Sequence, residues 1–255
     1  MADQNPDSGT YLALLRAMHR HARPRTYLEI GVADGASLAL ATRSTKVIGI
    51  DPRPRIDRLP RRWSVHAETS DEFFARSDAP AVLGEVDVAF IDGLHLFEQT
   101  LRDFIHVERY MASDGVVMLH DCHPPEASWG KREKRRRGWA GDVWKIIPIL
   151  EEYRPDLSVE VAAAAPTGLG IVTRLDRSNR QLDDCYEEIV SRYMDVPYQP
   201  RPATRPGTWP AVSDLFPVFR RPNTMDELER RSRTAWKVVW QRVRGVATRP
   251  RPHAV

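Results

Sequence analysis

One stretch constrains the fold more than any other: the apolar run YLEI at residues 27–30, followed by the turn GVADG at residues 31–35. Such a run, continued by Ala, Ser and Leu residues, predicts a strand, a turn and the start of a helix. Gly31 and Gly35 lack a Cβ atom, so the backbone can turn sharply and a ligand can approach free N–H groups there. The stretch therefore predicts an α/β fold with a site for a nucleotide-like cofactor.

A second acid supports this interpretation. Asp51 directly follows the apolar run KVIGI at residues 46–50, which predicts the next strand. In nucleotide-binding α/β folds, an acid at about this spacing binds the ribose hydroxyls of the cofactor. A glycine turn after a strand also occurs in α/β proteins that bind no ligand, but the added acid favours a cofactor site.

Composition sets wider limits. The chain has 255 residues, 42% of them hydrophobic and 29% charged, which is typical of a globular protein with one large domain or a domain and an extension. No apolar run approaches the ~18 residues of a membrane span. The polar N-terminus lacks a signal-peptide pattern, and the two distant cysteines favour a reducing compartment, so we expect a cytoplasmic location. A net charge of +3 does not by itself indicate nucleic-acid binding.

The chain continues with alternating strand and helix patterns. Apolar runs predict strands at residues 63–68, 86–92 and 115–121. Helices are expected at residues 8–22 with Ser8 as cap, after the glycine turn, at 70–74, and at 97–111 with a stop at Asp114 and Gly115. Strands that alternate with helices predict a doubly wound, mostly parallel sheet.

The end of this region refines the fold. A helix with an internal Pro148 is expected at residues 141–153, followed by strands at 157–165 and 168–175. Parallel neighbours need a crossover of about a dozen residues, so two strands this close, if they pair, pair antiparallel. A parallel sheet that ends in an antiparallel pair is not typical of dinucleotide-binding dehydrogenases.

The motifs EIGVADG, GID, FIDGLH, LHDC and GDVWK, in this order, resemble a group of class I S-adenosylmethionine (SAM)-dependent methyltransferases. This group carries an Asp-Gly-x-His signature and is related to metal-dependent O-methyltransferases of sugars and natural products. The resemblance covers roughly residues 11–175. It implies a seven-stranded, mostly parallel sheet with an antiparallel last strand in residues 1–176, and leaves residues 177–255 as a helical and proline-rich extension.

The resemblance also implies cofactor contacts. Glu29 and Gly31, beside the turn glycine Gly35, would meet the methionine part of SAM, and Asp51 would bind the ribose. Glu68 or Thr69 would lie near the adenine, and Asp92 would border the same site. The implied reaction is methylation of a hydroxyl on a small-molecule acceptor, a sugar or secondary metabolite.

The chemistry is expected where the two central strands end, since ligands bind outside the carboxyl ends of parallel strands. Methylation of a hydroxyl is helped by a base or by a divalent cation. We expect His95 to be the base beside Asp92, and Asp92, Asp121 and His120 to hold Mg²⁺ or Mn²⁺. His120 stands where some metal-dependent relatives carry an acid, which favours softer metals than Mg²⁺.

Structural alternatives remain for these groups. Asp92 can cap the next helix, and His120 or His123 can bind backbone carbonyls. The basic loop at residues 129–141 is either a solvated loop or a lid over the place where the acceptor enters, and in the second case Trp139 belongs to the lid. A basic amphipathic helix predicted from Thr224 can pack on its own domain, on a second copy in a homo-oligomer, or on a membrane surface.

Three other functions fit parts of the sequence. An NAD-dependent oxidoreductase fits Asp51 but not the glycine spacing, which lacks the middle glycine of the dinucleotide fingerprint. An RNA methyltransferase would use the basic loop, yet no RNA-binding module is recognisable, so a nucleic-acid partner is not expected. A non-catalytic cofactor-binding subunit would not need the cluster of His95 and Asp121.

Overall fold

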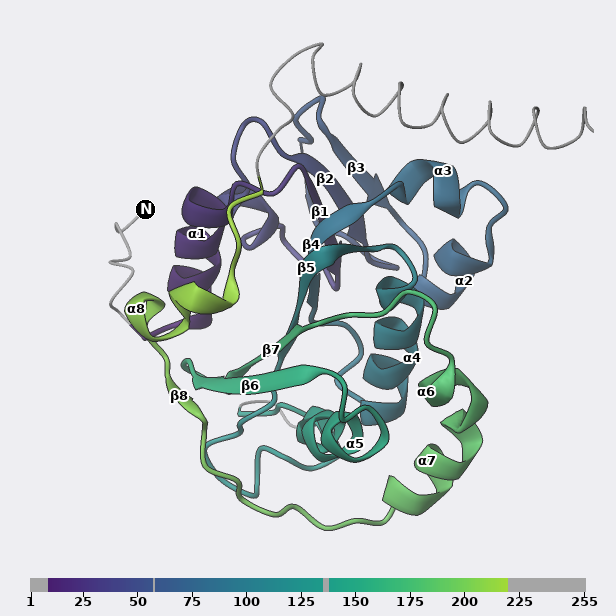
Figure 1. Cartoon of the computed structure of the whole chain (residues 1–255), viewed down its shortest axis with the longest axis vertical. Coiled ribbons are helices and arrows are strands. Elements are labelled where there is room, and N and C mark those ends of the chain that lie inside the picture. Colours follow the sequence, from purple (N-terminus) through teal and green to yellow (C-terminus); the bar gives the residue numbers. More distant parts are fainter. Residues whose placement is uncertain (1–8, 57, 135–137, 220–255) are drawn as a thin grey trace, which may run out of the picture. The chain divides into compact units, whose positions relative to one another are not determined.

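The computed structural model describes residues 9–56, 58–134 and 138–219. Its centre is an eight-stranded sheet with the order β3-β2-β1-β4-β5-β7-β6-β8 (Figure 1). The strands are β1 Thr26–Ile30, β2 Lys46–Ile50, β3 Trp63–His66, β4 Val86–Ile91, β5 Met111–His120, β6 Ser158–Ala163, β7 Leu169–Thr173 and β8 Arg205–Pro206.

The strand directions confirm the predicted topology. Strands β3, β2, β1, β4 and β5 pair in parallel, whereas β7 runs antiparallel to both β5 and β6. The seven expected strands are present, and the proline-rich region adds the short β8, parallel to β6. This order differs from that of dinucleotide-binding dehydrogenases, in which a sixth parallel strand follows the fifth.

Helices cover both faces of the sheet. Helix α1 (Tyr11–Ala22) lies on one side of the strands, and α4 (Phe97–Glu108) and α5 (Ile146–Tyr153) lie on the other (Figure 1). The shorter helices are α2 Ser70–Ala75, α3 Ala79–Leu83, α6 Gln181–Asp184, α7 Tyr186–Tyr193 and α8 Trp209–Val212. None of the helices in the described part of the chain is long and apolar enough to span a membrane.

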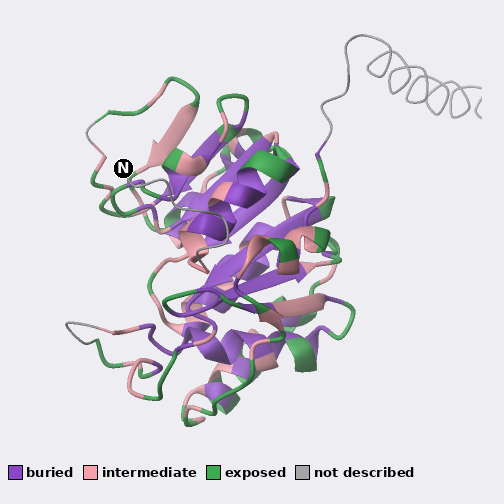
Figure 2. Ribbon diagram, turned by 90° about the vertical axis from the view of Figure 1, so that its left-hand side faces the viewer, coloured by how far each residue is buried: buried purple, intermediate pink, exposed green. Residues whose placement is uncertain are grey.

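Strand β4 shows why the central runs are apolar without interruption. Its residues alternate between the two faces of the sheet: Ala89 and Ile91 pack in the core with α4 and α5, and Val88 and Phe90 pack in the core with α1. The central strands are accordingly buried along their length (Figure 2). The sheet is therefore packed on both faces, and the loops that follow its strands extend from this buried core.

Several predicted boundaries are wrong, for local reasons. Thr10 caps α1, because its hydroxyl accepts the N–H of Ala13 at 3.2 Å, while Ser8 lies outside the described residues. The expected helix after the glycine turn is only the 3-10 turn Leu38–Leu40. Strand β5 begins before Asp114 and Gly115, which form an irregularity inside the strand and do not stop α4.

The later helices also differ from the prediction. A 3-10 turn, Val143–Lys145, precedes α5, and Pro148 lies in the first turn of α5, where a missing N–H costs little. The predicted helical extension begins with two helices, Gln181–Asp184 and Tyr186–Tyr193, which meet at Cys185. The helix predicted from Thr224 lies outside the described residues.

The first part of the extension packs on the sheet. Leu182 and Ile189 join the core with α4, and Val212 and Phe216 join the core with α1. Because these residues are buried in the same cores as the strands, residues 181–219 cannot detach without exposing apolar surface. The proposed division of the chain at residue 176 stays a prediction.

Candidate active site

The turn after β1 closes tightly against the end of β4. Gly31 has a φ of +88°, and a Cβ atom on it would lie 1.9 Å from the carbonyl oxygen of Asp92. Its N–H donates to the carbonyl of Ile50 at 2.9 Å, and the N–H of Asp92 donates to that of Ile30 at 2.8 Å. Only glycine fits this crossing, which holds the ends of β1, β2 and β4 together.

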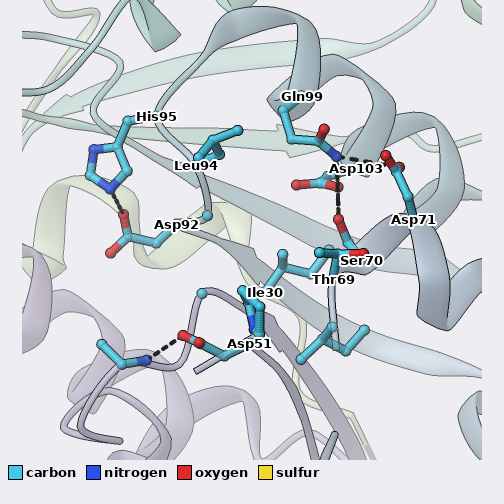
Figure 3. A pocket seen from close by; sticks show the side chains of 15 residues that line it. Ile30, Asp51, Thr69, Ser70, Asp71, Asp92, Leu94, His95, Gln99 and Asp103 are labelled. Carbon is cyan, nitrogen blue, oxygen red and sulfur yellow. Dashed lines mark hydrogen bonds and ion pairs between the residues drawn. The ribbon is translucent and has the colours of Figure 1, made fainter. Parts of the chain in front are cut away.

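A cavity of about 470 Å³ opens at these strand ends (Figure 3). Among the predicted cofactor residues, Gly31, Asp51, Thr69 and Asp92 line it, together with the predicted base His95; Glu29, Gly35 and Glu68 do not. The predicted residues that line the cavity come from four separate segments, so the fold brings together what the sequence keeps apart.

Asp51 is held by the backbone on both carboxylate oxygens. Oδ2 accepts the N–H of Ala33 at 2.8 Å, and Oδ1 accepts the N–H of Arg53 at 2.7 Å. These bonds fix the carboxylate at the end of β2, where it faces the cavity. The geometry agrees with its predicted position beside a ribose, and the ribose contact itself stays a prediction.

Glu29 lies beneath the glycine turn and is fully buried. Its carboxyl accepts the hydroxyl of Tyr27 at 2.7 Å and that of Ser37 at 2.5 Å. Burial raises the pKa of Glu29 to about 8, although both hydrogen bonds act in the opposite direction. Glu29 therefore supports the turn from below, and its predicted contact with the cofactor is untested.

Glu68 and Thr69 have different surroundings. Arg76 donates to Glu68 at 2.7 Å, and His66 lies 3.7 Å from the same carboxylate. Thr69 is the N-cap of α2 and forms a capping box with Glu72. Thr69 lines the cavity, whereas Glu68 does not line it and forms an ion pair with Arg76.

Beyond the end of the cavity, β4 and β5 bring three predicted groups together. His95 Nδ1 lies 2.5 Å from Asp121 Oδ2, and His95 Nε2 lies 3.4 Å from Asp92 Oδ1. One ligand atom from each of the three side chains lies within 4.8 Å of the others. The predicted convergence of the β4 and β5 loops is therefore present in the structure.

The backbone at this cluster is unusual. His95 and Asp121 both have positive φ values, +60° and +63°, a region that residues other than glycine seldom adopt. The ring of Trp139 stacks on the imidazole of His95, with centroids 5.1 Å apart and planes 8° from parallel. A Cβ on Gly141 would lie 1.7 Å from the carbonyl oxygen of His95, so the loop after β5 closes directly over it.

The charges in the cluster stabilise one another. Burial alone would lower the pKa of His95, but the carboxylates of Asp121 and then Asp92 outweigh it, so the pKa is raised. Burial would likewise raise the pKa of Asp92, but His120 and then His95 outweigh it and lower that pKa. The carboxylates thus make the His95 imidazole more basic, and the imidazoles favour the ionised form of Asp92.

His120 also lies beside the carboxylates of Asp92 and Asp121, and its predicted metal role stays a prediction. Its Nδ1 lies 3.1 Å from Asp92 Oδ1, and its Nε2 lies 3.3 Å from the hydroxyl of Thr167. The ring of Tyr11 covers it at a centroid distance of 4.2 Å. His120 therefore orients Asp92, and neither it nor His123 belongs to the converging group of Asp92, His95 and Asp121 found among the described residues.

The basic loop is tied down at its described ends. Arg132 pairs with Glu98 at 2.7 Å and with Asp142 at 2.8 Å, and the indole N–H of Trp139 donates to the carbonyl of Lys131 at 2.8 Å. Residues 135–137, which carry part of the predicted charge, lie outside the described residues. Arg132 is therefore a structural residue, and Trp139 is the loop residue that meets the cluster.

Sequence reasoning did not identify four polar residues that line the cavity, Ser70, Asp71, Gln99 and Asp103. The sequence carried no signal for Asp103, because helical spacing places it about 200° around α4 from Leu101, off the predicted apolar stripe, and only the structure shows that it is buried.

Comparisons with known proteins agree with this fold. Residues 28–122 match the family model described as a methyltransferase domain. A curated relative, the uncharacterized protein R132 of Acanthamoeba polyphaga mimivirus, is 26% identical over 112 residues, which span 38% of this chain and 51% of that protein. The matched part thus spans about half the length of this relative.

Two solved structures are also similar. The S-adenosylhomocysteine (SAH)-bound methyltransferase PaMTH1 of Podospora anserina is 13% identical, with a TM-score of 0.51 over 65% of this chain and 78% of that chain. The O-methyltransferase TomG of Streptomyces achromogenes, solved with SAM, is 13% identical, with a TM-score of 0.44 over 63% and 77%. The chain thus has the fold of class I SAM-dependent methyltransferases, and its residues 28–122 match a methyltransferase domain.

Proposed function

We propose that the protein transfers a methyl group from SAM to a hydroxyl oxygen of a small-molecule acceptor, a sugar or natural product, with His95 as the general base. The observation that carries the proposal is the pairing of His95 Nδ1 with Asp121, 2.5 Å apart, at the rim of a cavity that His95 itself lines. An imidazole held in this way by a carboxylate is suited to take a proton through its other nitrogen.

Methyl transfer needs an oxygen nucleophile aligned with the sulfonium methyl group. Asp121 orients the ring through Nδ1, so Nε2 is the nitrogen that accepts the acceptor's proton. Asp92 Oδ1 lies 3.4 Å from Nε2 and stabilises the imidazolium that forms. The indole of Trp139 stacks on the imidazole of His95, which restrains the tilt of the imidazole and excludes water from one of its faces.

The cavity fits the cofactor in size and in polarity. Its volume of about 470 Å³ lies in the range of ligand pockets, ~300–1,000 Å³. Asp51 would accept the ribose hydroxyls, and the glycine at position 31 would let the methionine part lie against the backbone. The methyl group would then lie beside Asp92, between the cofactor and His95.

A divalent cation is a second way in which the same cluster can act. His95 Nδ1 and Asp121 Oδ2 are buried, and neither atom has a hydrogen-bond partner outside this pair among the described residues, so the two would share a cation in place of a proton. Asp92, His95 and Asp121 would hold it, a donor set that suits Mn²⁺ at least as well as Mg²⁺. Such an ion would lower the pKa of the acceptor hydroxyl as a Lewis acid.

The test is transfer of labelled methyl from SAM to a panel of hydroxylated sugars and phenols, with and without added Mn²⁺ or a chelator. We expect His95→Gln to lower turnover by about 10²–10⁴-fold and to leave SAH affinity unchanged. The control His21→Gln alters an exposed histidine away from the cavity. Full turnover in His95→Gln would contradict the base role, and loss of turnover in the chelated wild type would favour the cation.

A further inference from the structure

The end of the cavity away from His95 contains a buried acid whose bonding is incomplete. Asp103 on α4 is 1% exposed, and its Oδ1 accepts the hydroxyl of Ser70 at 2.6 Å and the amide of Gln99 at 3.0 Å. No described residue donates a hydrogen bond to its Oδ2, which lies beside Gly93 on the cavity wall. One half of the carboxylate is thus saturated and the other half faces the cavity.

Asp103 Oδ2 accepts no hydrogen bond from a described residue, so it offers a free acceptor to a ligand that supplies an N–H or O–H. Burial raises the pKa of Asp103 to about 6, against the opposing bonds from Ser70 and Gln99. At neutral pH the group is still mainly ionised, and it therefore acts as an acceptor. The amide of Gln99 already donates to Oδ1, which leaves Oδ2 for the ligand.

The position of Asp51 orients the cofactor in the cavity. In Figure 3, Asp92 and His95 lie on one side of Asp51, and Ser70, Gln99 and Asp103 lie on the other. If the reacting methyl is at His95 and the ribose is at Asp51, the nucleoside base must extend toward Asp103. This step rests on the proposed function.

The walls of this end fit a flat heteroaromatic ring. Ile50, Pro52 and Leu94 line the cavity and offer apolar surface to such a ring. Apolar walls around a ring, with an acceptor at its edge, are the pattern by which proteins bind and orient such ligands.

We propose that Asp103 Oδ2 accepts a hydrogen bond from the exocyclic amino group of adenine, so that Asp103 selects an adenine-bearing cofactor over its deaminated counterpart. Gln99 and Ser70 are positioning residues, since they hold Oδ1 and thereby turn Oδ2 toward the cavity. In the deaminated ligand a carbonyl oxygen replaces the amino group, and two acceptors would then face each other.

The test is calorimetric titration with SAH and with S-inosylhomocysteine, which differs from SAH in that amino group. A hydrogen bond to a charged group contributes about 1.5–3 kcal/mol, so the wild type should bind SAH at least ~10-fold more tightly. Asp103→Asn retains an acceptor for Ser70 and Gln99 and places an NH₂ group at Oδ2. This variant should bind SAH about 10-fold more weakly, and the preference should disappear or reverse.

Asp78→Asn is the control for the lost charge, because Asp78 is an exposed acid outside the cavity, and it should keep the wild-type preference. Equal wild-type affinities for the two ligands would overturn the inference and leave the proposed function intact, as would an unchanged preference in a folded Asp103→Asn. The wild-type comparison holds even if that variant does not fold. Absence of SAH binding by the wild type would overturn both.

Discussion

Replacing Gly31 by alanine should be far more damaging than a positive φ angle alone explains. A non-glycine residue in a sparsely populated region of backbone space costs about 1–3 kcal/mol. At Gly31 the new Cβ would also lie 1.9 Å from the carbonyl oxygen and 2.4 Å from the carbonyl carbon of Asp92. Because these are backbone atoms, they cannot move aside without displacing the end of β4, which adds about 1–3 kcal/mol or more.

Gly84 provides a matched control. It also has a positive φ, +63°, but nothing lies within 4 Å of the position that a Cβ atom would take there. Urea unfolding should therefore give a loss of unfolding free energy of about 1–3 kcal/mol for Gly84→Ala and at least ~1 kcal/mol more for Gly31→Ala. Equal losses in the two variants would refute the claim that Gly31 is required by its contact with Asp92.

Three further predictions concern buried polar groups. Glu108→Gln should lower the free energy of unfolding in urea by about 3 kcal/mol, since Glu108 pairs with the buried Arg154 at 2.7 Å. Glu152 pairs with Arg192 at the surface, so Glu152→Gln should lower it by under ~1 kcal/mol in the same assay. Tyr27→Phe removes a donor to Glu29 and should cost about 1–3 kcal/mol, and a neutral result in urea unfolding would argue against that bond. The pKa of Glu29 is raised on folding from 4.5 to about 8, so the folded protein binds its proton more tightly and loses stability as pH rises through this window. The free energy of unfolding, measured in urea at several pH values across this window, should fall less steeply with rising pH for Glu29→Gln than for the wild type. Equal slopes would show that Glu29 is not the cause.

The sheet could be predicted because its signals are local or depend on chain connectivity. Continuous apolar runs such as residues 86–91 are the pattern of strands buried on both faces, and β4 has this burial. The short connection between β6 and β7 excludes a parallel pair, and the structure pairs them antiparallel. The predicted ends of helices and strands were wrong near Thr10, Leu38 and Gly115. Caps and bulges depend on single hydrogen bonds, which tertiary contacts decide.

The site was predictable only in part. The strand-end rule brought His95, Asp92 and Asp121 together, since it requires only strand order. The same rule placed His120 beside Asp92 and Asp121, but its contact with Thr167 in a distant loop was not predictable, because it depends on tertiary packing. Gln99 and Asp103 were missed for a similar reason: they act from a helix whose rotation about its axis is set by packing.

The most direct test of the account is a calorimetric titration of the protein with SAH, alone and with added Mg²⁺ or Mn²⁺, for the wild type, Asp51→Ala and the surface control Asp78→Ala. We expect micromolar binding by the wild type and the control, and its loss in Asp51→Ala, because Asp51 is the acid fixed at the cavity wall by Ala33 and Arg53. A change in SAH affinity on addition of the metal would indicate that Asp92, His95 and Asp121 bind a cation. No binding of SAH under any of these conditions would contradict the assignment of the cavity to SAM.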